Sequence, residues 1–153
     1  LLVQGAEPNA SCMMNKTALS TAVRESPFPI IEMLLPHAGQ IFPGSLLHMA
    51  IFRTLDDRKA VVDYLLQNGA PIDELLHWDN PNAAACEFFA LGTPLYYAAA
   101  AGDVQMVRFL LGRGADANVR SSHGDTALQK AEAKGHTHVG DCLRDYSDST
   151  SRL

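Results

Sequence analysis

A fixed spacing between two copies of one short motif constrains this chain more than any other feature. Gly92-Thr93-Pro94-Leu95 recurs as Gly124-Asp125-Thr126-Ala127-Leu128, and the two threonines lie 33 residues apart. The stretch between them reads as an alanine-rich helix, a break at a glycine, an apolar second helix and a Gly-Ala-Asp turn. A period of this length is typical of stacked helix–turn–helix repeats, which build extended surfaces for macromolecules rather than pockets for chemistry.

Further copies of the unit can be located once this phase is set. One begins at Thr17 and another at Ser45, and each is followed by an apolar second helix. The chain opens on Leu1–Asn9, which matches the end of a unit, and without an initiating Met. We therefore expect it to be a piece of a longer protein. We predict one domain over residues 1–146 and a flexible tail at 147–153. The domain divides into a partial repeat at 1–11, repeats at about 12–43, 44–74, 91–120 and 121–146, and a long insertion at 74–90.

Periodicity and end signals support helix pairs. The second helix of the best copy has an apolar stripe at i, i+3, i+6 and i+7, made of Val104, Val107, Leu110 and Leu111. Gly69 and Gly114 follow second helices, where a left-handed C-terminal residue is expected. Asp103 and Ser26 precede second helices as N-caps. Because one helix pair cannot bury its apolar face alone, stacking is the predicted source of stability.

The pattern resembles the ankyrin-repeat family. The resemblance extends to about Asp145 and rests on elements that recur in phase, best seen in Thr93-Pro94-Leu95, Ala98 and Ala99, Gly102, Met106-Val107, Leu110-Leu111 and Gly114-Ala115-Asp116-Ala117-Asn118. It implies an all-α fold, an ankyrin-like repeat solenoid of helix–turn–helix pairs with hairpin-like loops. The family's histidine survives only as His48, and its place is taken elsewhere by Ser20, Tyr96 and Gln129. We expect these exchanges to weaken the usual hydrogen-bond net.

Composition narrows the class of partner and the compartment. The net charge is −5 and no Lys/Arg-rich run is present, which argues against nucleic acid or anionic membranes as partners. Apolar stretches are interrupted well short of the roughly 18 residues that a membrane span needs. Cys12, Cys86 and Cys142 are odd in number and have no paired spacing, so they read as free thiols. We therefore expect an intracellular location, cytoplasmic or nuclear.

Few residues here suit metal binding or catalysis. His138 and Cys142 share a helix face near His136 and Asp141, but a structural zinc site needs four well-placed ligands. Gly135-His136 also occupies the family's own turn position, which is the favoured interpretation. No Gly-x-Ser-x-Gly elbow or Cys motif with a matching His pattern occurs. We predict no catalytic site, no metal site and no cofactor.

The resemblance implies that a partner meets the loop tips and the exposed side of each first helix, on a concave face. Carried over by motif, these positions are Met13, Met14, Lys16, Arg24, Glu25, Phe52, Arg53, Ser122, His123, Asp125 and Lys134.

The insertion at 74–90 carries the only Trp of the chain, Trp78, and the pair Phe88-Phe89. Long loops in compact proteins are either functional or disordered, and this composition is poor for disorder. Aromatic residues are also frequent among those that dominate binding energy at interfaces. Two interpretations remain open. The aromatic residues fold back onto the repeats and shield them, or they contact a partner directly.

The sequence predicts a non-catalytic protein–protein interaction module, a scaffold or adaptor, with a protein partner of unknown identity. It is expected to be monomeric or part of a longer repeat array, and to bind neither nucleic acid nor membrane. An alternative is a regulatory or substrate-docking arm of a larger enzyme or signalling ATPase, truncated upstream of residue 1. A third hypothesis is purely structural, with the repeats bracing a longer solenoid.

Overall fold

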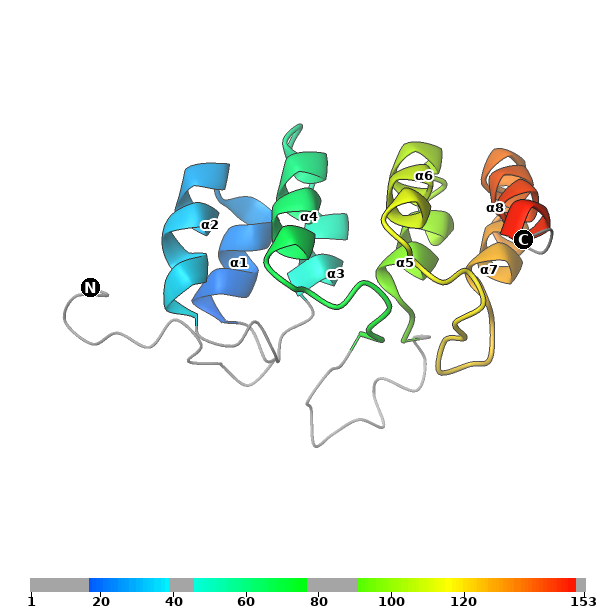
Figure 1. Ribbon diagram of the computed structural model, residues 1–153, viewed down its shortest axis with the longest axis horizontal. Coiled ribbons are helices and arrows are strands. Elements are labelled where there is room, and N and C mark those ends of the chain that lie inside the picture. Colours follow the sequence, from blue (N-terminus) through cyan, green and yellow to red (C-terminus); the bar gives the residue numbers. More distant parts are fainter. Residues whose placement is uncertain (1–16, 39–45, 77–90, 151–153) are drawn as a thin grey trace. The chain divides into compact units, whose positions relative to one another are not determined.

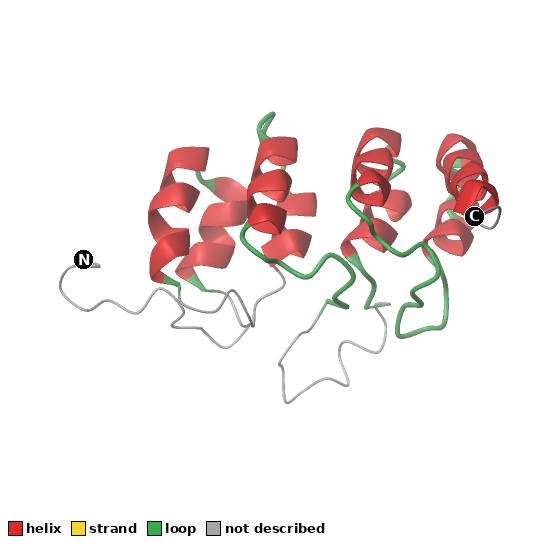
Figure 2. Ribbon diagram, in the orientation of Figure 1, coloured by secondary structure: helices red, strands yellow, loops and turns green. Residues whose placement is uncertain are grey.

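The computed structural model describes residues 17–38, 46–76 and 91–150, and within these ranges the chain is helical, with no strand (Figures 1 and 2). The helices follow one another in pairs. Their bounds are α1 Ala18–Glu25, α2 Phe28–Leu34 with the 3-10 turn η2 Leu35–His37, α3 Leu46–Ile51, α4 Arg58–Gln67, α5 Pro94–Ala100, α6 Val104–Gly112, α7 Ala127–Ala133 and α8 Thr137–Thr150.

The chain divides into two compact units, each made of two helix pairs. The first unit holds α1 to α4, in which α1 packs on α2 and on α3, and α3 packs on α4. The second unit holds α5 to α8 and also the segment Ile72–Leu76. In it, α5 packs on α6 and α7, and α8 packs on α6 and α7. The predicted all-α arrangement of stacked helix pairs is confirmed, and the single-domain count stays a prediction.

Threonines begin three of the first helices. The hydroxyl oxygens of Thr17, Thr93 and Thr126 each accept a hydrogen bond from the backbone N–H three residues ahead, at 3.0, 3.2 and 3.3 Å. Ser20 and Gln129 then accept from the N-cap backbone N–H, at 2.9 Å in both cases. The result is a reciprocal capping box at two helices.

These boxes correct the expectation of a weakened net where Ser20 and Gln129 replace the family's histidine. A short hydroxyl or amide side chain at the third helical position can reach back to the N-cap, so the bond is retained. Tyr96 cannot do this. Its ring is buried, and its hydroxyl finds no hydrogen-bond partner within the described part of the chain.

The second helices show the predicted apolar stripe and end signals. Of the predicted stripe in α6, Val107, Leu110 and Leu111 are buried, Val104 is only half-buried, and Met106 is buried in addition. Gly69 and Gly114 adopt the left-handed conformation that ends their helices, with φ of 88° and 92°. Asp103 caps α6 by accepting from the backbone N–H of Met106 at 3.0 Å. Ser26 does not cap α2, because Pro27 takes the N-cap position and no side chain bonds there.

The chain's last helix continues past the predicted start of the tail. α8 extends through Thr150. Two hydrogen bonds support its final turns: Ser147 Oγ donates to the Leu143 carbonyl at 3.0 Å, and the Tyr146 hydroxyl donates to the Leu111 carbonyl at 3.5 Å. The boundary at residue 146 therefore does not mark the end of helical structure.

Candidate protein-binding surface

Arg53 is the most unexpected residue of the first unit. It follows α3, and only 1% of it is exposed. Its Nε and Nη2 atoms donate to the two carboxylate oxygens of Asp57 at 2.6 and 2.7 Å. Nη1 donates to the Val23 carbonyl at 2.9 Å, and Nη2 also donates to the Ser26 carbonyl at 2.8 Å. We call this set of four contacts the guanidinium clamp.

The clamp satisfies carbonyls that α1 leaves open at its end. The natural helical donor for the Val23 carbonyl would be the N–H four residues ahead, but that residue is Pro27, which has none. The planar fork of Arg53 supplies the missing donor and also places a positive charge at the negative end of the helix. The second helix pair is thereby fastened to the first.

The prediction that Arg53 lies on an exposed helix face, where a partner would meet it, is therefore wrong. The three extra residues between Phe52 and Lys59 lengthen the turn from α3 to α4. In this longer turn Arg53 faces inward, and Asp57 at i+4 completes the ion pair. The hydrogen bond from Arg53 lowers the pKa of the Asp57 carboxyl below its ordinary value of 3.8, against the opposing effect of its partial desolvation.

The other predicted residues of the first unit lie on its surface. Arg24 and Glu25 are exposed at the end of α1, and their side chains approach to 3.7 Å, a weak exposed pair. Phe52 is exposed at the start of the turn into α4, and Leu55 of the same turn is also an exposed apolar residue. Sequence reasoning did not single out Leu55, because the inserted turn has no counterpart in the other copies.

Met13, Met14, Lys16, Trp78, Phe88 and Phe89 lie outside the described residues.

In the second unit, the loop at 116–126 is tied to the chain on either side of the insertion. Ser122 Oγ accepts from the Leu91 N–H at 2.8 Å, and the Ser122 N–H donates back to the Leu91 carbonyl at 2.9 Å. The Asp116 N–H donates to an Asp73 carboxylate oxygen at 3.0 Å, and the Leu76 N–H donates to the Gly92 carbonyl at 3.0 Å. Burial raises the pKa of Asp73, in spite of the bond from Asp116.

Inside this loop, Ser121 organises the tip. It is buried, its N–H donates to the Asp125 carbonyl at 2.8 Å, and its hydroxyl accepts from the N–H groups of His123 and Asp125 at 3.3 Å each. Arg120 closes the turn with a 2.7 Å bond to the Gly124 carbonyl. These bonds fix the backbone that presents Ser122, His123 and Asp125. A single sequence offers no signal for the part played by Ser121.

The first-helix side of the second unit mixes aromatic and basic groups. Lys134 is exposed at the end of α7. The ammonium of Lys130 lies 5.4 Å from the centre of the Tyr96 ring, which itself packs edge to face on Tyr97 at 5.6 Å. Burial raises the pKa of Tyr97 above its ordinary value of 10.0. Tyr96 is buried, so its ring serves packing.

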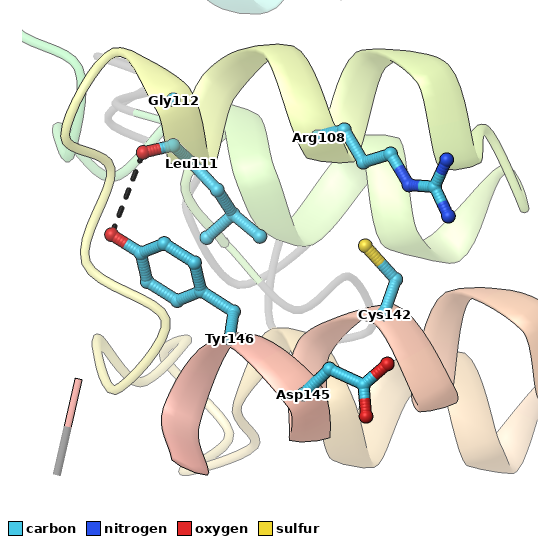
Figure 3. A pocket seen from close by; sticks show the side chains of 6 residues that line it. All are labelled: Arg108, Leu111, Gly112, Cys142, Asp145 and Tyr146. Carbon is cyan, nitrogen blue, oxygen red and sulfur yellow. Dashed lines mark hydrogen bonds between the residues drawn. The ribbon is translucent and has the colours of Figure 1, made fainter. Parts of the chain in front are cut away.

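A small open hollow of about 360 Å³ lies between α6 and α8 of the second unit (Figure 3). Six residues line it: Arg108, Leu111, Gly112, Cys142, Asp145 and Tyr146. The Cys142 thiol points toward α6, and no imidazole is present in the lining to act as its base.

His136, one of the two histidines considered above as a metal ligand, has a packing role. His136 Nε2 lies 3.2 Å from the Ala100 carbonyl, and its ring lies against Gly102 so closely that a Cβ on that glycine would come within 2.8 Å. His138 is exposed. Within the described ranges, no three His, Cys, Asp or Glu side chains gather as a metal site would require. None of the described helices is long and apolar enough to cross a membrane.

Comparisons with known proteins agree with this architecture. Residues 88–131 match the family of ankyrin repeats that occur in many copies. The ankyrin repeat domain of Bcl-3 superposes with a TM-score of 0.72 at 24% identity, over 93% of this chain and 60% of that one. That similarity establishes the fold alone.

Three plant proteins match part of the sequence. Probable E3 ubiquitin-protein ligase XBOS33 of Oryza sativa subsp. japonica is 48% identical over 52 residues, which is 34% of this chain and 10% of that protein. The same organism's XBOS32, of the same description, is 35% identical over 78 residues, or 51% of this chain and 16% of that protein. E3 ubiquitin-protein ligase XBAT33 of Arabidopsis thaliana is 46% identical over 52 residues, 34% of this chain and 10% of that protein. The matches thus span only a small part of these relatives.

Ankyrin repeats are protein–protein interaction modules, and the recurring capped helix pairs, the matched family and the superposed domain agree with one another. Residues 88–131 belong to the ankyrin-repeat family, and the chain has the fold of an ankyrin-repeat domain.

Proposed function

We propose that this chain is a non-catalytic scaffold or adaptor that binds a protein partner through its loop tips and the exposed side of its first helices. The observation that carries the proposal is the tethered loop at 116–126. Its backbone is fixed by reciprocal bonds with Leu91 and by Ser121, while the side chains of His123 and Lys134 are exposed. A loop that is ordered before binding loses less conformational entropy when a partner docks.

The proposed contacts that the structure describes are exposed, apart from Asp125, which is half-buried. They are Arg24, Glu25 and Phe52 in the first unit and Ser122, His123, Asp125 and Lys134 in the second, with Met13, Met14, Lys16, Trp78, Phe88 and Phe89 added from the sequence alone. Arg53 is withdrawn from this set because its donors are already used in the guanidinium clamp. We place the protein in a reducing, intracellular compartment, since its cysteines have no paired spacing.

Two matched double variants test the proposed face. A partner is first captured from the source organism and purified. Its affinity is then measured for the parent, for His123→Ala/Lys134→Glu, and for His138→Ala/Arg108→Glu. Both variants make the same chemical changes at exposed positions of one unit, the first at the loop and α7, the second at α6 and α8. The proposal predicts a loss of about tenfold or more only for the first, since a binding hot spot contributes about 2 kcal/mol.

A third variant examines the insertion. Trp78→Ala/Phe88→Ala/Phe89→Ala, checked for unchanged helical circular dichroism, loses binding if these aromatic residues contact the partner and keeps it if they serve packing. Binding that is lost in the α6 and α8 variant and kept in the other two would overturn the proposal.

A second candidate function has one observation in its favour. The matched relatives are named as ubiquitin-protein ligases, and the stretches that match this chain make up only 10 to 16% of their lengths. The chain would then be the substrate-docking arm of a larger enzyme. A full-length protein from the source gene that transfers ubiquitin to the captured partner, and stops doing so with His123→Ala/Lys134→Glu, would favour this candidate over a free-standing adaptor.

A further inference from the structure

The helix α7 carries two lysines one turn apart, which we call the lysine pair. Lys130 is half-buried, and Lys134, the C-cap of the helix, is exposed. Residues four apart lie on one face of a helix, with about 5–6 Å between their Cβ atoms, and like charges at this spacing repel. This repulsion offsets part of the favourable interaction that each ammonium has with the C-terminal end of the helix dipole.

The lysine pair has no compensating carboxylate. Within the described ranges, neither ammonium takes part in an ion pair. Glu132 is the only acid of α7, and its carboxylate accepts a hydrogen bond from Arg144 of α8 at 2.7 Å. Lys130 extends toward α5 instead, where its ammonium lies 5.4 Å from the centre of the Tyr96 ring. The described part of the chain thus supplies no anion to either lysine.

The neighbouring helix α5 adds uncharged groups to the same face. α5 and α7 pack directly on each other (Figure 1). The 33-residue offset between their threonine caps places Tyr97 at the position of Lys130, and Ala101 at the position of Lys134. Ala101 is exposed and Tyr97 is half-buried. Because alanine is small and neither residue is charged, a chain that docks on α5 can approach the lysine pair closely.

The first helix of the first unit carries different residues at these positions. Thr21 and Glu25 lie 109 residues before the lysine pair, the offset that also separates the caps of α1 and α7. Glu25 lies 3.7 Å from Arg24, so these two side chains leave little net charge. The lysine pair is therefore a property of α7 that the repeat pattern does not require.

Charge complementarity favours an acidic protein segment as the occupant of this face. A lysine ammonium acts as a compact point charge, whereas bidentate recognition of phosphate favours arginine. In an extended chain, residues two apart point to the same side and lie about 7 Å from each other, close to the separation of the two lysines. The net charge of −5 also repels long polyanions such as nucleic acids.

We propose that the lysine pair of α7, together with Tyr97 and Ala101 of α5, binds an extended acidic segment of the protein partner. Two carboxylates, two residues apart in that segment, each meet one ammonium. This inference rests on the proposed function, because it names the chemistry of the partner at the same first-helix face.

The probe is a heptapeptide with blocked ends in which alanine and glutamate alternate, and its control has glutamine in place of glutamate. Backbone amide shifts of the labelled chain are followed by NMR in the parent, in Lys130→Gln/Lys134→Gln and in Arg108→Gln/Arg113→Gln. The arginine variant removes the same charge at α6 and its C-cap. It is closely matched, because Arg113 lies 4.9 Å from the centre of the Phe109 ring much as Lys130 lies over Tyr96.

We expect the glutamate peptide, and not the glutamine peptide, to shift amides of α7 and α5. The lysine variant should raise the dissociation constant about fivefold, since two exposed ion pairs are lost, and the arginine variant should change it less than about twofold. Binding should also weaken strongly between about 0.05 and 0.5 M salt, because the Debye length shortens. Unchanged helical circular dichroism in both variants shows that the fold is intact.

Equal shifts with the two peptides, or shifts that the lysine variant leaves unchanged, would overturn the proposal. A short single-stranded oligonucleotide of the same net charge that shifts α7 more strongly than the glutamate peptide would overturn the choice of a protein segment as the occupant. The proposed function is judged by a different result, the affinity of the captured partner for His123→Ala/Lys134→Glu. A partner lost by that variant, with no response of α7 to the glutamate peptide, would refute the acidic chemistry and leave the proposed first-helix face standing.

Discussion

Replacing Arg53 by Met tests the guanidinium clamp, because Met keeps an unbranched apolar chain of similar length and removes every donor. Removing one member of a buried, hydrogen-bonded ion pair typically costs about 3–5 kcal/mol. Two features of the structure determine how much unfolding free energy the Arg53→Met variant loses. The Asp57 side chain is 33% exposed, so water can hydrate its carboxylate and reduce the loss. The Val23 carbonyl is buried and has no other donor, because Pro27 lacks an N–H, and leaving it unpaired costs about 1–3 kcal/mol.

These two considerations place the expected loss at about 3 kcal/mol, a large part of the roughly 5–15 kcal/mol that stabilises a typical domain. Urea unfolding followed by circular dichroism at 222 nm measures it. Arg24→Met is the matched control, since Arg24 is exposed and its pair with Glu25 is weak, and it should change the unfolding free energy by less than about 0.5 kcal/mol.

Amide hydrogen exchange then locates the effect. The first unit, α1 to α4, should exchange faster in Arg53→Met, and amides in α7 and α8 should change much less, since local openings follow the packing of each region. A loss below about 1 kcal/mol for Arg53→Met, or a loss equal to that of Arg24→Met, would refute the reasoning about the unpaired carbonyl and the severed ion pair.

Three further changes have defined outcomes. The pKa of Asp57 is lowered in the folded state, so the stability it adds is present above its ordinary pKa of 3.8 and lost as the pH falls through the folded value. Asp57→Asn should therefore lower the urea midpoint at pH 7, and the difference from the parent should shrink at pH 3. Thr126→Ala should cost about 1 kcal/mol in urea unfolding by removing the α7 cap, and Thr126→Ser should restore most of it. Gly102→Ala should reduce the free energy of unfolding by about 1–2 kcal/mol and so lower the melting temperature, because φ is +72° and the new Cβ would clash with the His136 ring. Gly112→Ala should increase the free energy of unfolding by about 0.5–1 kcal/mol and so raise the melting temperature, because this helical glycine has open space around its Cβ position. Shifts of the same sign for the two glycine variants would contradict the conformational argument.

The sequence predicted the features that are set by short-range patterns. The threonine caps, the left-handed Gly69 and Gly114 and the apolar stripe of α6 all depend on residues within one or two helical turns. Such signals repeat with the period of the chain, so each copy supports the interpretation of the others.

Contacts between residues far apart in the chain could not be predicted in the same way. Arg53 meets carbonyls 27 and 30 residues away, and Ser122 meets Leu91 at a separation of 31 residues. Arg53 was placed on the surface because the repeat pattern was carried across an insertion that changes which way the side chain faces. In the second unit the link from one helix pair to the next is made by a histidine and not by an arginine. His136 lies within hydrogen-bond distance of the Ala100 carbonyl.

Protection from hydrogen exchange in a purified complex with the captured partner tests the central claim most directly. We predict that the partner slows exchange in the loop at 121–126 and at the end of α7, and that the outer helices α6 and α8 exchange as they do in the free chain. Protection confined to α6 and α8, with the loop and α7 unchanged, would contradict the claim that this protein recognises its partner through loop tips and first helices.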